Sequence, residues 1–71
     1  MNESLFLLNI ENPDFWWEIE LSGGKVVIIR VISHLRDPRN VPLTLFVNNK
    51  SGAAYEIPWS AIQTIKQHKE K

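Results

Sequence analysis

The sequence has no cysteine and no long hydrophobic run, and each absence excludes a class of protein. Without cysteine there is no disulfide framework and no thiolate nucleophile. The longest near-apolar stretch, residues 26–32, contains Arg30 and is far shorter than the roughly 20 residues that a transmembrane helix needs. Glu3 stands where a secretory signal would be basic, and no small-residue cleavage site follows. We therefore expect a soluble, cytoplasmic protein with no membrane partner.

The chain has 71 residues, which is enough for one small domain only. A domain of this size buries only about 60% of the surface of its unfolded chain and is marginally stable. Disulfides and structural metal ions usually support so small a domain, but the sequence has no cysteine and no evident cluster of metal ligands. We expect residues 1–71 to form a single domain that gains stability by assembling into a homo-oligomer.

Basic residues are absent from the first 24 positions. All eight Lys and Arg residues lie at Lys25 or beyond, so the two parts of the chain carry net charges of about −5 and +5, although the whole is neutral. A neutral chain has no general electrostatic attraction to nucleic acid or to anionic membranes. The asymmetry fits ion pairs between neighbouring strands, or a head-to-tail contact between an acidic and a basic edge of two subunits.

Four turn-forming segments divide the chain into short apolar runs. The turns are ENPD, SGG, HLRDPRN and NNKSG, at residues 11–14, 22–24, 34–40 and 48–52. The runs between them are rich in β-branched and aromatic residues and predict strands at residues 15–21, 26–33, 41–47 and 54–59. Pro42 cannot donate a ladder hydrogen bond, so it belongs at the start of its strand or on an edge.

The alternation of side chains along these strands assigns each to a face. The first strand has one face formed by Phe15, Trp17, Ile19 and Leu21, and another formed by Trp16, Glu18 and Glu20. The predicted core faces of the third and fourth strands are Leu43, Leu45 and Val47, and Tyr55, Ile57 and Trp59. The second strand is apolar on both faces apart from Arg30, which is typical of a central strand covered on both sides or bent around a barrel. Trp17 is therefore predicted to lie in the core and Trp16 outside it.

Both ends of the chain allow two interpretations. Residues 3–10 suit a strand or a short helix. Residues 60–67 contain the capping-box spacing of Ser60 and Gln63, which suits a helix that Pro58 prevents from extending upstream. At this end we favour a single turn followed by a short closing strand.

Successive strands with short connections predict a mainly β, antiparallel meander. An open sheet this small has exposed edges and little core, so closure into a barrel of about five strands is the stable solution. The candidates are SH3-like and Sm-like barrels, with a short helix at the N-terminal or C-terminal end as an open alternative.

The segment IPWSAIQTI, residues 57–65, resembles the second sequence motif of the Sm-like proteins. Ile57, Ile62 and Ile65 keep the apolar spacing of that motif, and residues 59–65 are similar to the Lys-His-Ala-Ile-Ser-Thr-Val segment of the Hfq branch. Asp37, Asn40 and Leu43 resemble the first Sm motif. The resemblance covers residues 15–66 and implies a ring of subunits that share strands and bind RNA. The pair that lines the RNA pore in that family is replaced by Pro58-Trp59 or Trp59-Ser60.

Enzymatic chemistry has little support in the sequence. His34 and His68 lie in a predicted loop and in the C-terminal tail, and no serine stands in a nucleophile-elbow context. Glu18 and Glu20 share a strand face, which is most simply a solvated face. We expect no catalytic, cofactor or metal site and no small-molecule substrate, so the protein is interpreted as a binding or regulatory module.

Two surfaces are candidates for that binding. Protein interfaces are enriched in aromatic residues, and the predicted interface residues are Trp16, Phe46 and Trp59, which contact a second copy or another protein. Alternatively, the loop at residues 34–40 offers donors and planar groups to RNA. The residues predicted for this second function are His34, Arg36, Arg39 and Asn40, with Tyr55 as a stacking platform.

Overall fold

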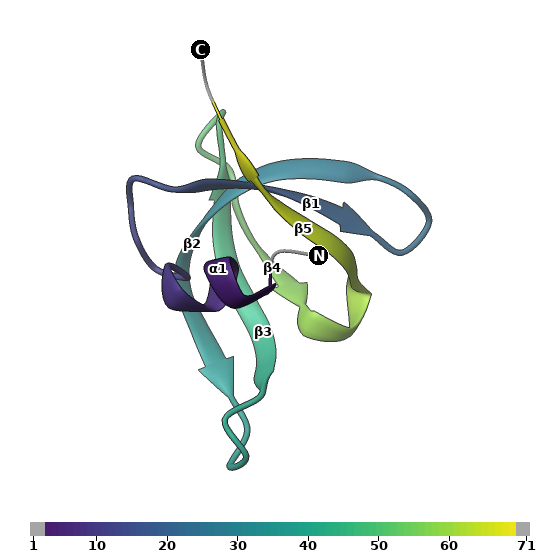
Figure 1. Ribbon diagram of the computed structural model, residues 1–71. Helices are drawn as coiled ribbons and strands as arrows, with labels where there is room; N and C mark the ends of the chain where they lie inside the picture. Colours follow the sequence, from purple (N-terminus) through teal and green to yellow (C-terminus); the bar gives the residue numbers. More distant parts are fainter. Residues whose placement is uncertain (1–2, 70–71) are drawn as a thin grey trace.

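The computed structural model describes residues 3–69, which form one short helix and five strands (Figure 1). In chain order the elements are α1 (Glu3–Leu8), β1 (Trp16–Leu21), β2 (Val26–Arg36), β3 (Pro42–Asn49), β4 (Ala54–Pro58), the 3-10 turn η1 (Trp59–Ala61) and β5 (Ile62–His68). The mainly β class is confirmed, as is the closing strand after a single turn at the C-terminal end. Residues 3–10, which suited either a strand or a helix, begin with a helix. No helix in the described part of the chain is long and apolar enough to cross a membrane.

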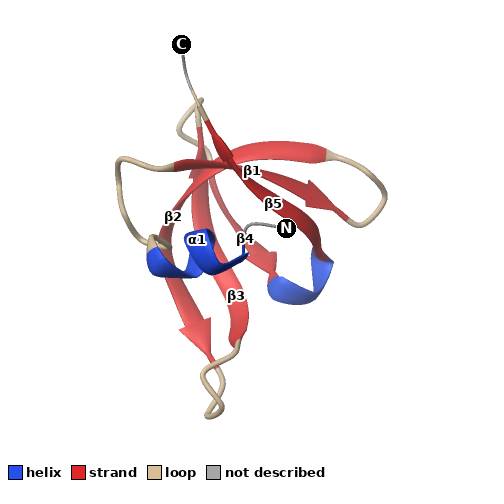
Figure 2. Cartoon of the chain, viewed as in Figure 1, coloured by secondary structure: helices blue, strands red, loops and turns tan. Residues whose placement is uncertain are grey.

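All five strands belong to one antiparallel sheet (Figure 2). Their order is β4-β3-β2-β1-β5. The first and last strands of the chain, β1 and β5, are therefore neighbours, and the two edges of the sheet are β5 and β4. Within residues 3–69 no ladder joins β4 to β5, so the sheet is open rather than hydrogen-bonded into a barrel. The core is completed on the inner face of this sheet by side chains and by the helix.

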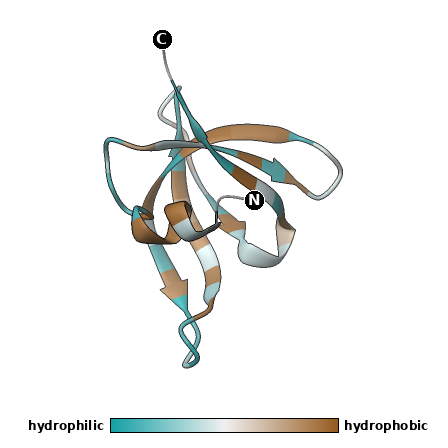
Figure 3. Ribbon diagram, viewed as in Figure 1, coloured by the Kyte–Doolittle hydropathy of each residue, from teal (hydrophilic) through white to brown (hydrophobic). Residues whose placement is uncertain are grey.

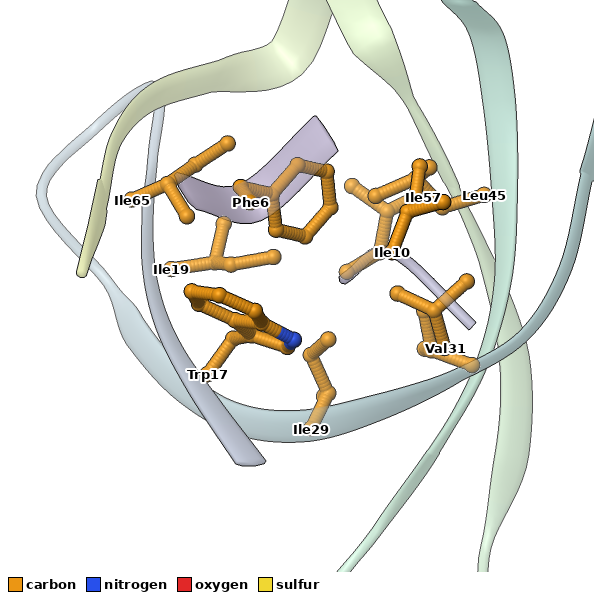
Figure 4. Packing of buried hydrophobic residues seen from close by; sticks show 10 residues of the cluster. Phe6, Ile10, Trp17, Ile19, Ile29, Val31, Leu45, Ile57 and Ile65 are labelled. Carbon is orange, nitrogen blue, oxygen red and sulfur yellow. The ribbon is translucent and has the colours of Figure 1, made fainter. Parts of the chain in front are cut away.

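The core receives side chains from α1 and from all five strands (Figure 4). Its buried members are Phe6, Ile10, Trp17, Ile19, Ile29, Val31, Leu45, Val47, Ile57 and Ile65. Phe6 meets the indole of Trp17 edge to face, with 5.0 Å between ring centroids, and stacks on the indole of Trp59 at 6.0 Å. The helix is brown in Figure 3 because it is mostly apolar, and it covers the inner face of the sheet.

Trp17 is fully buried, as its place in the alternating strand predicts. Trp17 and Ile19 face the core, while Glu18 and Glu20 lie on the opposite, outer face of the sheet. The indole Nε1 of Trp17 is buried on the side of Ile29 and has no hydrogen-bond partner in the described part of the molecule (Figure 4). An unpaired buried donor costs about 1–3 kcal/mol, which the burial of so large a ring must offset.

The second strand differs from its prediction in length and in burial. It continues to Arg36, because residues 33–36 pair with β3, so His34 lies in a strand and not in a loop. Val26 and Ile32 have 57% and 54% of their surface exposed, so this strand is not covered on both faces. The register with β3 shifts between Val31 and Ser33, which leaves Ile32 as a bulge outside the core.

The far end of the β2–β3 hairpin runs past α1 and therefore leaves the core (Figure 1). Leu43 was predicted to face the core with Leu45 and Val47, but 54% of its surface is exposed. The register with β2 shifts between Leu35 and Arg36, which leaves Leu43 without a partner in that ladder, as in a β-bulge. Pro42 begins β3, as its missing N–H requires.

Contacts between β1 and β5 balance part of the acidic excess of the first part of the chain. Glu18 on β1 lies 3.5 Å from Lys66 Nζ and accepts a hydrogen bond from His68 on the neighbouring strand β5. Glu20 accepts a hydrogen bond from Thr64 on the same strand. The contacts of Glu18 are ion pairs between neighbouring strands of the kind that the charge asymmetry allowed.

We predict that Phe6→Ala destabilises the domain by about 3–5 kcal/mol, because Phe6 is fully buried between two indoles. Leu8→Ala in the same helix is the matched control, since 84% of Leu8 is exposed, and should change the free energy of unfolding by no more than about 0.5 kcal/mol. Urea unfolding followed by circular dichroism measures both. Equal losses would mean that the helix does not dock through Phe6.

Candidate functional site

The outer face of the sheet carries a row of polar and aromatic residues around Trp16. Trp16 on β1 pairs with His68 on β5. On its other side β1 is antiparallel to β2, and Trp17 pairs with Ile29. Arg30, the next residue of β2, therefore lies beside Trp16. Arg30 in turn pairs with Asn48 of β3. These four residues, His68, Trp16, Arg30 and Asn48, are called the Trp16 row below.

Two cations lie over the indole of Trp16. The guanidinium carbon of Arg30 is 5.1 Å from the ring centroid, and Nζ of Lys50, from the turn after β3, is 4.1 Å from it. Such cation–π contacts contribute about 0.5–1 kcal/mol each at exposed sites. Trp16 lies on the face opposite the core, as predicted, but these contacts within its own chain cover part of its ring.

An open cleft of about 600 Å³ adjoins the other side of Trp16. Its lining residues are Pro13, Asp14, Trp16, Gln67, His68 and Lys69. The residues before β1 reach this place because Asn12 holds a tight turn, accepting a hydrogen bond from the backbone N–H of Asp14. Trp16 is thus the residue that the cleft and the pair of cations have in common.

Glu18 balances charge next to the Trp16 row. The hydrogen bond from His68 and the nearby ammonium of Lys66 hold the pKa of Glu18 below its usual range. His68 thereby has one ring nitrogen, Nδ1, occupied by Glu18 at 2.8 Å. This carboxylate and its two partners, Lys66 and His68, form one hydrogen-bonded group on the outer face.

The turn between β2 and β3 is organised by Asp37. One carboxylate oxygen accepts hydrogen bonds from the backbone N–H groups of Arg39 and Val41, at 2.9 and 3.0 Å. The other accepts two from the guanidinium of Arg39, at 3.2 and 3.0 Å. The bonds from Val41 and Arg39 hold the pKa of Asp37 below its usual range. Asn40 completes the turn with φ at +67°, a left-handed conformation that asparagine tolerates.

His34 and Arg36 are also joined within the hairpin. Arg36 donates from Nε to Nε2 of His34 at 2.9 Å and from Nη1 to the carbonyl oxygen of Asn40 at 3.0 Å. The opposite ring nitrogen of His34 contacts the carboxylate of Glu11, which ties the segment before β1 to β2. Several donors that were predicted to meet RNA are therefore used to build the hairpin.

The structure brings together four of the five residues predicted for RNA binding: His34, Arg36, Arg39 and Asn40. Tyr55 lies apart from them, on β4 opposite Val47, where burial raises the pKa of its hydroxyl. Tyr55 therefore does not form a stacking platform beside the loop.

The three residues predicted for a protein interface lie in different surroundings. Trp59 packs against the core on Phe6, so its ring is explained by the fold itself. Phe46 is half-buried on β3, between Ser33 and Glu56 on the neighbouring strands. Trp16 is half-buried under its two cations.

The sequence offers Arg30 and Lys50 only as cations near an aromatic platform such as Trp16, and neither is among the residues predicted for the two sites. Arg30 had one visible signal, because it is the single charge in an otherwise apolar strand. Lys50 is 34 positions from Trp16 in the sequence, so only the register of β1, β2 and β3 shows that they meet.

Among residues 3–69, no three histidine or acidic side chains come together in a group that could hold a metal ion. Comparison of the chain with protein-family models, with curated proteins and with solved structures finds no match.

We predict that Asp37→Asn weakens the fold in a pH-dependent way. Because the pKa of Asp37 is lowered in the folded state, its carboxylate stabilises the fold above the ordinary pKa of 3.8, and this contribution is lost as pH falls through the folded pKa. The difference in unfolding free energy between the two proteins should be largest above about pH 5 and should shrink below pH 4.

Urea titrations at several pH values measure this difference. Asp14→Asn, which removes an exposed carboxylate before β1, is the control for the change in net charge. A difference that stays constant from neutral pH to pH 3 would contradict the role of the Asp37 carboxylate.

Proposed function

We propose that this protein is a non-enzymatic binding or regulatory module that self-associates through the edges of its sheet and holds a protein partner. The observation that carries the proposal is the open sheet, whose edge strands β4 and β5 each have only one neighbour within the described chain. Edge strands present unpaired N–H and C=O groups, which are ready to pair with another chain. The pairing of β4 in one copy with β5 in the next satisfies both edges.

The direction of the free groups on β4 follows from the β3–β4 hairpin. The backbone N–H of Asn49 donates to the carbonyl oxygen of Ala53 at 2.9 Å, and hydrogen-bonded pairs alternate with non-bonded pairs along an antiparallel ladder. The pairs formed by Ala54 and by Glu56 with β3 are then of the non-bonded kind. Their N–H and C=O groups point away from β3, toward the open edge.

This assembly agrees with the resemblance to the Sm-like proteins. A short helix followed by five antiparallel strands is compatible with a small Sm-like or SH3-like barrel in which a neighbouring subunit completes what the single sheet leaves open. The homo-oligomer also supplies the support that a marginal domain without disulfides needs.

Exposed apolar residues support a protein partner in addition to self-association. Four of them lie in the far part of the β2–β3 hairpin, between residues 32 and 43: Ile32, Leu35, Val41 and Leu43. Several large apolar side chains exposed on one projecting element are more than a small monomer usually displays. The alternative function, RNA binding by an Sm-like ring, has less support because Arg36 and Arg39 already donate to groups of their own hairpin.

We predict that the native protein has a mass of several times 8.2 kDa at micromolar concentration, and that Ala54→Pro lowers it toward that of a monomer. Proline removes the N–H of Ala54, which points to the free edge, and costs no hydrogen bond to β3. Light scattering coupled to size exclusion measures both masses.

The matched control is Ala54→Ser, which keeps the N–H at this exposed position and should keep the mass of the native protein. Circular dichroism verifies that both variants remain folded. A monomeric native protein would refute self-association, and an unchanged mass for a folded Ala54→Pro variant would exclude the β4 edge.

A further inference from the structure

We propose that the last part of β2, residues 33–36, binds an extended segment of a partner protein as an added β-strand. This inference rests on the proposed function as a protein-binding module, and it names the place where the partner binds and the conformation in which it binds. The segment pairs with the backbone of His34 and Arg36 and places an apolar side chain beside Leu35. Residues 33–36 are called the free edge of β2 below.

The first support is that the free edge of β2 has a neighbouring strand on one side only. It pairs with β3, whereas β1 pairs only with residues 26–29 of β2. β1 begins at Trp16 because the chain before it turns away, and the backbone N–H of Phe15 donates to the carbonyl oxygen of Asn12. The arrowhead end of β2 extends beyond β1 with β3 along one side (Figure 1). Such an edge presents unpaired N–H and C=O groups to another chain.

The second support is the direction of the backbone groups on this edge. At the turn the N–H of Asp37 donates to the carbonyl oxygen of Val41 at 2.9 Å, so these residues form a hydrogen-bonded pair. The next pair, Arg36 with Pro42, is then of the non-bonded kind, and the N–H and C=O of Arg36 point away from β3. The same groups of His34, two positions earlier, point the same way. Within residues 3–69 no backbone hydrogen bond from another element reaches these groups.

The third support is the apolar surface beside this edge. Leu35 lies between His34 and Arg36 in the strand, and 54% of its surface is exposed. Its side chain projects from the opposite face to theirs, alongside Thr44 of β3. Ile32, which is also 54% exposed, precedes the free edge as a bulge. An added strand covers Leu35 with the side chain that pairs with it, and cross-strand pairs of apolar residues stabilise a sheet.

The chemistry of the free edge of β2 selects a peptide segment over a nucleic-acid strand. Alternating N–H donors and C=O acceptors match the backbone of another extended peptide, and strand addition of this kind is a general mode of peptide recognition. Phosphates are acceptors only and are bound by free basic groups, whereas Arg36 and Arg39 donate to groups of their own hairpin.

The proposed assembly leaves this edge for a different chain. β4 of one copy pairs with β5 of the next, so both outer edges of every sheet are occupied in the homo-oligomer. The free edge of β2 belongs to neither contact. A second copy therefore has no unpaired edge to offer to it, and the occupant is an extended segment of another protein.

Amide hydrogen exchange, measured by NMR on the native protein, tests whether the edge is free. The amides of His34 and Arg36 should exchange at least about tenfold faster than those of Ser33 and Leu35, which point toward β3. Equal protection of all four amides would overturn the proposal. Protection of His34 and Arg36 that rises with protein concentration would also overturn it, because the occupant would then be a second copy.

Peptides selected from a random-peptide display library against the native protein provide the segment. They should contain an apolar β-branched or aromatic residue, and synthetic copies should slow exchange of the His34 and Arg36 amides at least about tenfold. Docking through side chains alone would leave these two amides unchanged.

Two matched pairs of variants separate the backbone from the side chains. Arg36→Pro removes an N–H that points to the free edge and costs no hydrogen bond to β3, whereas Arg36→Ala loses the same side chain and keeps the N–H. Peptide affinity, measured by fluorescence anisotropy, should be roughly tenfold weaker in Arg36→Pro than in Arg36→Ala.

Leu35→Ala should weaken peptide binding roughly threefold or more, because the added strand covers this side chain. Val26→Ala is its control, since Val26 is an apolar residue of the same strand with 57% of its surface exposed, at a place where β1 already pairs with β2. It should leave affinity within about twofold of the native value. Circular dichroism verifies that every variant remains folded.

Three outcomes of the peptide experiments would overturn the proposal. The first is a selection that enriches no peptides, or peptides that bind without slowing exchange at His34 and Arg36. The second is equal affinity of folded Arg36→Pro and Arg36→Ala for the peptides. The third is an oligouridylate that displaces the peptides and binds more tightly, which would assign the edge to nucleic acid. None of these readings depends on the mass of the Ala54→Pro variant, so strand addition and self-association can fail separately.

Discussion

The contact between Phe6 and the two indoles of Trp17 and Trp59 is the constraint on which the rest of the structure depends. No hydrogen-bonded ladder closes the sheet between β4 and β5 in the described chain, so side chains must join its two sides. Phe6 does this directly, because one of its neighbours belongs to β1 and the other to the turn that follows β4. A six-residue helix is too short to be stable by itself, and it is held by this packing.

The burial of Trp17 also decides what the outer face displays. Side chains in a strand alternate between faces, so an inward Trp17 forces Trp16 outward. The ladders then set its neighbours, with His68 on one side and Arg30 on the other. The surroundings of Trp16 on the outer face therefore follow from the core, since a register shift of one residue would change both.

The β2–β3 hairpin shows how a segment with the composition of a recognition loop can serve the fold. Asp37 satisfies two backbone N–H groups and the guanidinium of Arg39, and Arg36 bridges His34 and the carbonyl oxygen of Asn40. A ligand could use these donors only if their hydrogen bonds within the hairpin were broken first. The exposed groups of the hairpin include four large apolar side chains, those of Ile32, Leu35, Val41 and Leu43, as well as the Arg39 guanidinium.

The sequence by itself determined the features that depend on local periodicity and turn residues. Alternation placed Trp17 and Ile19 in the core, Pro42 began its strand, and the turn signals separated the first four strands, because each of these effects acts over a few positions. Tertiary structure decided the features that depend on distant partners. Residues 3–8 became a helix because Phe6 found two indoles, and β2 reached Arg36 because β3 paired with it. Lys50 met Trp16 because three strands aligned, a coincidence of register that no local pattern encodes.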